Sequence, residues 1–166
     1  MDLVDGIWLV KLGNLLIVKN KDDEWPFPAC PQMDSGGPVD LPSEGNLNLG
    51  IKWLVRTEFI YVDGGNMQFE AGKNQAWFDL DKLTQPLTLR IRRDGDRFEP
   101  LGMEGRQMKV SDCMINEHLP ARARKNYPLV CSGDNIIWIP GVKAGHTARV
   151  SPETRRILHI TLVRQD

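Results

Sequence analysis

Arginine side chains recur on one face of a predicted strand, where they could bind phosphate. Arg90 and Arg92 alternate with apolar residues in a strand predicted over residues 87–92. Both therefore lie on the same side, about 6.6 Å apart at ~3.3 Å per residue. A planar guanidinium group can bind a phosphate through two N–H groups at once, so the pair favours contacts along a nucleic-acid backbone. The alternative is a solubilising strand face whose arginines pair with Asp94 and Asp96.

More cations surround the glycine-containing loop that follows this strand. They are Arg93, Arg97, Arg106 and Lys109. Gly102 and Gly105 would let the backbone of the loop approach a ligand closely. Lys109 begins a helix predicted over residues 109–117, and the free N–H groups of a helix N-terminus attract phosphate. The alternative is that the glycines only form turns and that the side chain of Lys109 is solvated.

A third cationic group lies in a second short helix. We predict that this helix begins at Pro120, because proline suits the first position of a helix. The group consists of Arg122, Arg124 and Lys125, and no acidic residue is closer in sequence than Glu117. These side chains could extend the basic surface. The alternative is a solvated helix face.

Other kinds of site find little support in the sequence. The histidines His118, His146 and His159 share no metal-ligand spacing, so we expect no metal site. No nucleophile and base stand at positions from which the sequence alone could bring them together. We therefore expect no catalytic residues in this chain.

Cysteine usage and hydropathy bear on where the protein acts. The three cysteines are odd in number and form no CxxC pair, which argues against a disulfide framework or a zinc knuckle. No stretch approaches the roughly 20 apolar residues that cross a bilayer. The first residues also lack the basic and small-residue features of a signal peptide. We expect a reduced, cytoplasmic setting without membrane contact.

The charge of the chain is divided unevenly between its two halves. Residues 1–80 hold 6 Lys and Arg against 12 Asp and Glu, a net charge of −6, whereas residues 81–166 hold 15 against 10, a net charge of +5. This division indicates that only the second half contacts a polyanion. The alternative is two ordinary solvated faces.

The predicted elements that position these cations define an α+β fold. Residues 1–82 are rich in short strands, beginning with a hairpin over residues 7–19 around Gly13-Asn14 and followed by a proline-rich loop. Residues 83–166 are predicted to form a separate small mixed-sheet domain with two short helices. In the first helix Val110, Cys113 and Met114 recur at helical spacing and should face the core. The tryptophans are predicted to be core residues rather than base-stacking platforms.

A long motif runs through the centre of this second half. Residues 92–116, RRDGDRFEPLGMEGRQMKVSDCMIN, resemble a segment of the C-terminal domain of tRNA(Ile)-lysidine synthetases, with the pattern RxxGDRFxPLGMxGxxKKVSDFFIN. The resemblance continues through 120–124, 128–130, 137–141 and 148–150. The chain departs from the pattern at Cys113 and Met114, where two phenylalanines are usual, and at Gln107-Met108.

The resemblance implies a function for the basic residues. In that family, basic residues in this region accompany binding of the tRNA acceptor stem. An N-terminal ATP-pyrophosphatase domain, which uses ATP, Mg and lysine, converts the wobble cytidine to lysidine. The ATP-binding loop of that domain has the pattern SGGxDS. This chain has Ser35-Gly36-Gly37 but no second serine, and prolines surround the segment, so we do not expect an ATP-binding loop here. We expect no cofactor in this chain, with tRNA and that catalytic domain as partners and a homodimer as one conceivable assembly.

A different class of function remains open at this point. The net charge of −6 in the first half and the pI of about 6.3 favour a module that docks on a catalytic partner without binding RNA. Salt separates the two interpretations, because RNA binding through phosphates weakens steeply as salt rises whereas apolar docking responds little.

Overall fold

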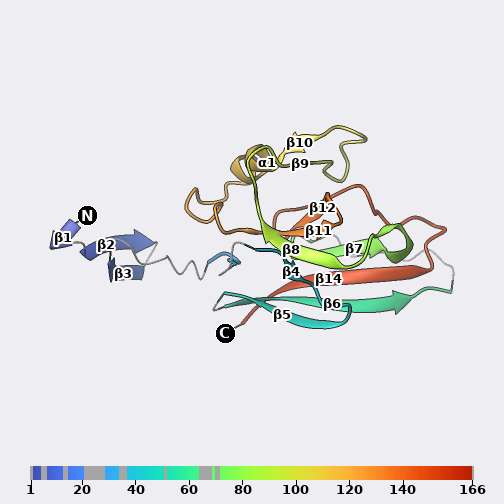
Figure 1. The fold of residues 1–166 in the computed structure, drawn as a ribbon, viewed down its shortest axis with the longest axis horizontal. Helices are drawn as coiled ribbons and strands as arrows, with labels where there is room; N and C mark the ends of the chain where they lie inside the picture. The colour runs from blue at the N-terminus through green and yellow to red at the C-terminus, as the bar shows by residue number, and fades with distance from the viewer. Residues whose placement is uncertain are drawn as a thin grey trace.

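The structure is a computed structural model that describes residues 2–4, 7–12, 15–20, 29–33, 37–50, 52–63, 69 and 72–165. Strands β1 (Asp2–Val4), β2 (Ile7–Leu12) and β3 (Leu15–Asn20) form a small antiparallel sheet (Figure 1). Leu12 pairs with Leu15, which confirms the hairpin predicted around Gly13-Asn14. Among the described residues, no helix is both long enough and apolar enough to cross a membrane.

Two larger antiparallel sheets form the body of the protein. The five-stranded sheet has the order β13 (Lys143–Ala144), β12 (Asn135–Ile139), β11 (Pro128–Ser132), β8 (Leu87–Ile91), β4 (Val39–Asp40). The four-stranded sheet has the order β5 (Gly45–Leu49), β6 (Trp53–Tyr61), β14 (Arg156–Arg164), β7 (Gln75–Asp79), and β7 leads into the 3-10 turn η1 (Leu80–Lys82). The sheets face each other and pack as a sandwich (Figure 1).

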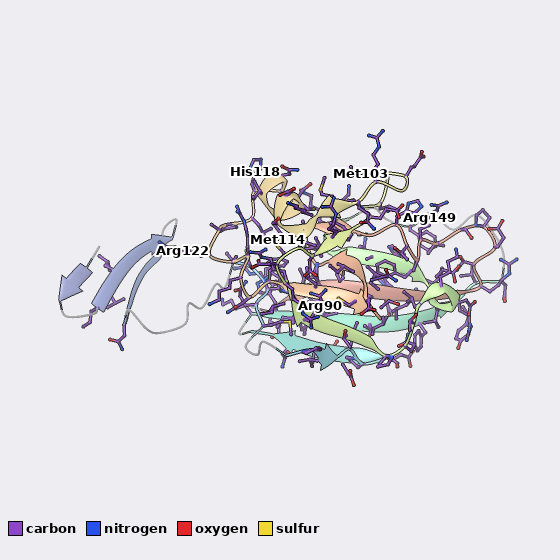
Figure 2. The ribbon with its side chains drawn as sticks, turned by 45° about the horizontal axis from the view of Figure 1, so that its top comes forward. Arg90, Met103, Met114, His118, Arg122 and Arg149 are labelled. Atoms are coloured by element: carbon purple, nitrogen blue, oxygen red, sulfur yellow. The ribbon has the colours of Figure 1, made fainter. Side chains whose placement is uncertain are left out.

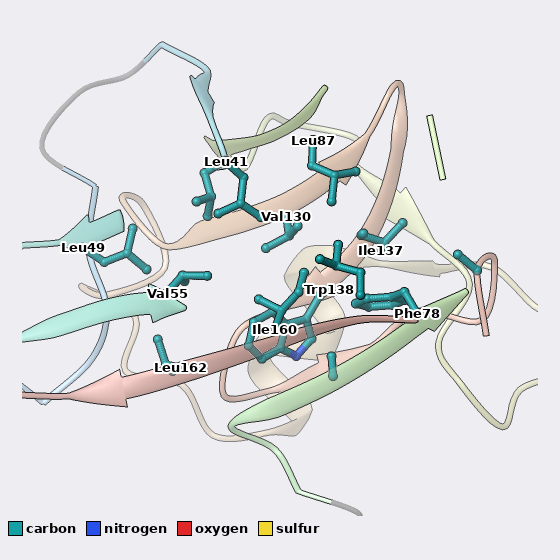
Figure 3. Close-up of a cluster of buried hydrophobic side chains, with 14 of the residues drawn as sticks. Leu41, Leu49, Val55, Phe78, Leu87, Val130, Ile137, Trp138, Ile160 and Leu162 are labelled. Carbon is teal, nitrogen blue, oxygen red and sulfur yellow. The ribbon is translucent and has the colours of Figure 1, made fainter. Parts of the chain in front are cut away.

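The main core lies between these two sheets. Along β14 the side chains of Leu158, Ile160 and Leu162 point inward, since alternate residues of a strand share a face. They meet Val130 and Trp138 from the five-stranded sheet (Figure 3). Trp138 is 1% exposed, which confirms the prediction of a core residue, whereas Trp77 is only half-buried and lies outside the core, so the prediction is wrong for Trp77.

A third layer covers the other face of the five-stranded sheet. It consists of α1 (Val110–Asn116) and a two-stranded ribbon of β9 (Arg97–Phe98) and β10 (Met108–Lys109), both above β8 and β11 in Figure 1. Val110, Cys113 and Met114 are buried here, as predicted, together with Phe98 and Leu129. Because both of its faces are covered, every residue of β11 is buried.

The predicted division between residues 82 and 83 does not separate two units in the described residues. β14 lies between β6 and β7, and β4 pairs with β8, so both sheets contain strands from either side of that boundary. Alternation and turn residues locate strands along the chain, but they carry no information about which distant strand becomes the partner. The expectation of a separate C-terminal domain is therefore corrected.

Two finer expectations are also corrected. All strand pairs among the described residues are antiparallel, so the sheet of the second half is not mixed. The segment from Pro120 to Lys125 forms two overlapping turns instead of a helix, with the N–H of Ala123 donating to Pro120 O over 2.9 Å. So short a helix is marginal unless packing supports it. The sequence also predicts a short strand over 67–70, but of these residues the structure describes only residue 69.

A core substitution tests whether the two halves of the chain share one cooperative unit. Ile160 is fully buried between the sheets. We expect Ile160→Ala to lower the free energy of unfolding by about 2–5 kcal/mol because it removes buried methyl groups and leaves a cavity. Urea unfolding measures the loss, and amide hydrogen exchange should accelerate in both β6 and β8.

The matched control is Val163→Ala, which truncates a half-buried residue of the same strand and should cost less. Accelerated exchange in β6 with unchanged protection in β8 would instead show two independently stable units.

Candidate nucleic-acid interface

Two predicted phosphate-binding residues face each other on the β9–β10 ribbon. Arg97 pairs directly with Lys109 across the two strands, and both side chains are exposed. The neighbouring pair, Phe98 and Met108, turns inward, with Phe98 3% exposed. Like charges directly opposite each other on paired strands are destabilising. The ribbon thus presents a concentration of positive charge that its own fold does not need.

Arg90, by contrast, is used inside the fold. Its guanidinium group donates two hydrogen bonds to Asp96, Nη1 to Oδ2 over 2.8 Å and Nη2 to Oδ1 over 3.0 Å. The two side chains are only 12% and 14% exposed. Asp96 also accepts a 2.6 Å hydrogen bond from the backbone N–H of Arg93. Pairing with Asp96, the alternative expectation for Arg90, is the arrangement found, and it turns this arginine away from phosphate binding.

The ion pair changes the protonation of both partners. Burial by itself favours the neutral acid, but hydrogen bonds from Arg90 and from the N–H of Arg93 outweigh it and hold the pKa of Asp96 below its ordinary value. The hydrogen bond with Asp96 in turn raises the pKa of Arg90. Asp96 is therefore a permanent anion at neutral pH, which fixes the turn from β8 into β9.

Arg92 and Arg93 lie at the start of this turn and differ in burial. Arg92 is half-buried, and its Nη1 lies 3.8 Å from Oδ1 of the fully exposed Asp94. Its Nε is buried and has no hydrogen-bond partner within the described part of the chain. Arg93 is exposed. Gly95, with φ of 86°, makes the tight turn that positions both side chains.

Arg106 lies one residue before the end of the loop of residues 99–107, which is held in a fixed shape. The N–H of Gly105 donates to Glu99 Oε1 over 2.7 Å, and the N–H of Leu101 donates to Ala144 O over 2.9 Å. Gly102 has φ of 89°, and a Cβ on it would meet no atom. The glycine is thus needed for backbone conformation, and the loop presents Arg106 as an exposed cation.

The start of α1 differs from the expected phosphate site. The helix has seven residues, and the N–H of Val110 already donates to Asp96 O over 2.9 Å. Lys109 occupies the N-cap position, and its side chain makes no capping bond to the described backbone of α1. Lys109 is therefore an exposed positive charge beside Arg97 and is not part of a phosphate site at the helix N-terminus.

The third cationic group lies on the turns after α1. Arg122 and Lys125 are exposed, whereas the Nε of Arg124 donates to Leu119 O over 2.8 Å and is partly buried. The fully buried Ala123 anchors these turns. In Figure 2, Arg122 and the loop carrying Met103 lie at opposite ends of the layer that contains α1. The structure thus brings Arg97 and Lys109 together but leaves the Arg122 group at a distance from the loop.

Sequence reasoning missed two cations near this layer. Lys143 and Arg149 line a cavity together with Leu101 of the loop and Trp77 of β7. The sequence signal for this cavity is the alternation in β7. Ala76 and Phe78 belong in the core, so Trp77 belongs on the opposite face of the sheet, where it lines the cavity.

The fold and this surface define a β-sandwich domain with a basic side layer of the kind that can contact nucleic acid. Residues 87–160 match the family model of the TilS substrate C-terminal domain. The crystal structure of a TilS C-terminal domain matches with a TM-score of 0.69 and 25% identity, over 80% of this chain and 99% of that one. Residues 87–160 thus belong to the TilS C-terminal domain family, which confirms the resemblance of the central motif.

Curated relatives give the same assignment. The chain is 35% identical over 123 residues to the tRNA(Ile)-lysidine synthase of Clostridium acetobutylicum, a match that covers 74% of this chain and 25% of that protein. It is 32% identical over 146 residues to the synthase of Dehalococcoides mccartyi, covering 84% and 28%. The chain spans about a quarter of the length of these relatives.

The buried ion pair yields a stability prediction. We expect Asp96→Ala to lower the free energy of unfolding by about 3 kcal/mol, the low end for breaking a buried pair, because Arg90 would remain largely buried without its partner. Urea unfolding at neutral pH measures the change. Asp94→Ala, which removes a fully exposed carboxylate from the same turn, should change it by no more than about 0.5 kcal/mol. Equal effects of the two substitutions would contradict the assigned role of Asp96.

The depressed pKa of Asp96 predicts an acid dependence with a definite sign. A carboxylate with a lower pKa in the folded state stabilises the fold above its unfolded pKa of about 3.9, and this contribution is lost as pH falls through the folded pKa. The stability gap between the wild type and Asp96→Asn should therefore be large near pH 6 and shrink well below pH 4. Unfolding midpoints of both proteins across this range provide the measurement, and a gap that does not change with pH would refute the linkage.

Proposed function

We propose that this chain binds tRNA through the phosphates of the acceptor stem. The observation that carries the proposal is the direct opposition of Arg97 and Lys109 on an exposed ribbon. Their mutual repulsion is relieved when an anion lies between or above them. Arg93 and Arg106, which are exposed at the two ends of the same segment, widen the positive surface.

Phosphate is the anion that this arrangement suits best. Backbone contacts orient a nucleic acid without reading its sequence, and the cations here belong to a pinned loop and a two-stranded ribbon instead of a flexible tail. A rigid array binds a regular polyanion with little loss of conformational entropy. The TilS assignment of residues 87–160 makes tRNA the polyanion we choose.

In this proposal the chain serves the catalytic part of a tRNA(Ile)-lysidine synthase. It holds the acceptor stem while that catalytic part, using ATP, Mg and lysine, converts the wobble cytidine to lysidine. The relatives named above are tRNA(Ile)-lysidine synthases of which this chain matches about a quarter. The work of this chain is binding and positioning, and its setting is the cytoplasm.

A docking module is the second candidate. Ile115 on α1 is 51% exposed, and Leu101 on the neighbouring loop is 44% exposed. Exposed apolar side chains mark a contact with another protein surface when they form a contiguous patch. They are scattered within a charged layer, however, and the Arg97–Lys109 opposition has no purpose in a purely apolar contact. RNA binding is therefore preferred.

The double variant Arg97→Ala, Lys109→Ala tests the proposal. We expect weaker binding to many tRNAs alike and a plot of log affinity against log salt that is flatter by about 0.7–0.9 for each lost contact. The free protein should be as stable as the wild type or slightly more so, because a repulsive cross-strand pair has been removed. Filter binding at several salt concentrations and thermal unfolding give the two readings.

The matched control is Arg56→Ala, which removes an exposed arginine of β6 that bonds Asn46. It should leave affinity and salt slope nearly unchanged. If the Arg97, Lys109 variant binds like the wild type, and a further Arg122→Ala, Lys125→Ala variant does too, the docking module becomes the better account.

A further inference from the structure

A cavity beside the proposed RNA surface has the size of a small-ligand site. Its volume is about 610 Å³, inside the range of roughly 300–1,000 Å³ typical of such sites. The side chains that matter for its chemistry are Phe69, Lys73, Trp77, Leu101, Lys143 and Arg149. They come from β7, β13, the segments beside these two strands and the loop of residues 99–107, so elements distant in sequence build one concave surface.

One wall of the cavity is aromatic and held in place. The ring of His159 stacks on Trp77 with centroids 3.6 Å apart and planes 6° apart. His159 is itself fixed, with its Nδ1 2.6 Å from Glu58 Oε1 and its Nε2 3.3 Å from Gln75 Oε1. The ring centroids of Phe69 and Trp77 are 5.0 Å apart, and the two ring planes are inclined by 42°. The result is a preorganised aromatic surface on the outer face of the four-stranded sheet.

The charges around the cavity favour an anionic ligand. Lys143 and Arg149 line it, and Arg149 is exposed. The carboxylate among the lining residues is Glu117, which Lys73 neutralises in a 2.6 Å ion pair. An aromatic wall with a cationic rim suits a ligand that combines a flat ring with a phosphate, which describes a nucleotide.

The cavity is rigidly joined to the Arg97–Lys109 ribbon. Leu101 lines the cavity and is four residues from Arg97, so their Cα atoms are at most about 14 Å apart. The intervening chain is fixed to the cavity wall, because the N–H of Leu101 donates to Ala144 O and the N–H of His146 donates to Glu99 O over 2.8 Å. A short single strand can cover this distance.

We propose that the cavity holds an unpaired nucleotide from the 3′ end of the acceptor stem, with its base against Trp77 and Phe69 and its phosphate near Lys143 and Arg149. The inference rests on the proposed function, because it requires that the paired part of the stem lies on the ribbon. Single-stranded ends are the parts of an RNA whose bases can be stacked on aromatic side chains. The 3′ end is the unpaired strand that adjoins the acceptor stem.

Two RNA probes and this chain test the inference. One probe is a complete tRNA, and the other is the same tRNA without its unpaired 3′ nucleotides. The wild type should bind the complete tRNA more tightly by about 5- to 150-fold for each stacked base. The variants Trp77→Leu and Lys143→Ala, Arg149→Ala should bind the two probes nearly equally, while their affinity for the truncated tRNA stays at the wild-type value.

Controls separate a lost site from a damaged fold. Trp77→Phe keeps an aromatic surface and should retain part of the preference. The Lys143, Arg149 variant changes only side chains at the rim, so it decides the question if Trp77→Leu unfolds. Arg155→Ala removes an exposed arginine that bonds Pro152 O outside the cavity, and it should keep the full preference.

Each outcome has one meaning. Equal binding of both probes by the wild type, with the Arg97, Lys109 variant still impaired, would overturn the nucleotide site and leave the proposed function standing. Failure of the wild type to bind either probe would overturn both. The cavity variants could also keep the preference for the complete tRNA and lose binding to the catalytic part of a synthase. That result would show that the cavity binds a protein segment, and it would also overturn the inference.

Discussion

The five-stranded sheet must be covered on both faces, and the arrangement of the rest follows from that requirement. β11 is buried at all of its positions and β12 at all but its first. One face is covered by the four-stranded sheet and the other by α1 and the β9–β10 ribbon. Burial of this much apolar surface is the dominant favourable contribution to folding. The burial of Phe98 also fixes the position of its neighbour Arg97, and of Lys109, which pairs with Arg97 across the ribbon.

Within this framework neighbouring arginines have different roles because of one carboxylate. Asp96 binds Arg90 in a buried pair and accepts the N–H of Arg93, while its own carbonyl oxygen receives the first N–H of α1. A single residue thereby connects the end of β8, the turn and the helix. Arg97, one position later, donates a long 3.5 Å hydrogen bond to Gln107 O and is exposed opposite Lys109. Cations that hold the fold together and cations that lie on its surface are thus distinguished by partners and burial, since their residue types are the same.

The sequence was most informative where the relevant interactions are local. Turn chemistry and alternation located the hairpin around Gly13-Asn14 and the strand that became β8, and helical spacing identified Val110, Cys113 and Met114 as buried. What it could not provide was pairing at long range, so the central place of β14 went unnoticed. The same limit applies to the site. Asp96 was recognised as a competitor for Arg90, but only coordinates could show which alternative prevails.

The central place of β14 has a consequence for how the chain is made on the ribosome. β6 and β7 both pair with β14, which begins only at Arg156. Of the described strands, β6 can pair only with β5 while the chain grows, and β7 finds no partner in its sheet before β14 is made. Two strand edges stay open for almost the whole of synthesis, and such edges recruit other chains. A translation stall before Arg156 would therefore release a polypeptide prone to aggregate, although it would already contain every strand of the five-stranded sheet.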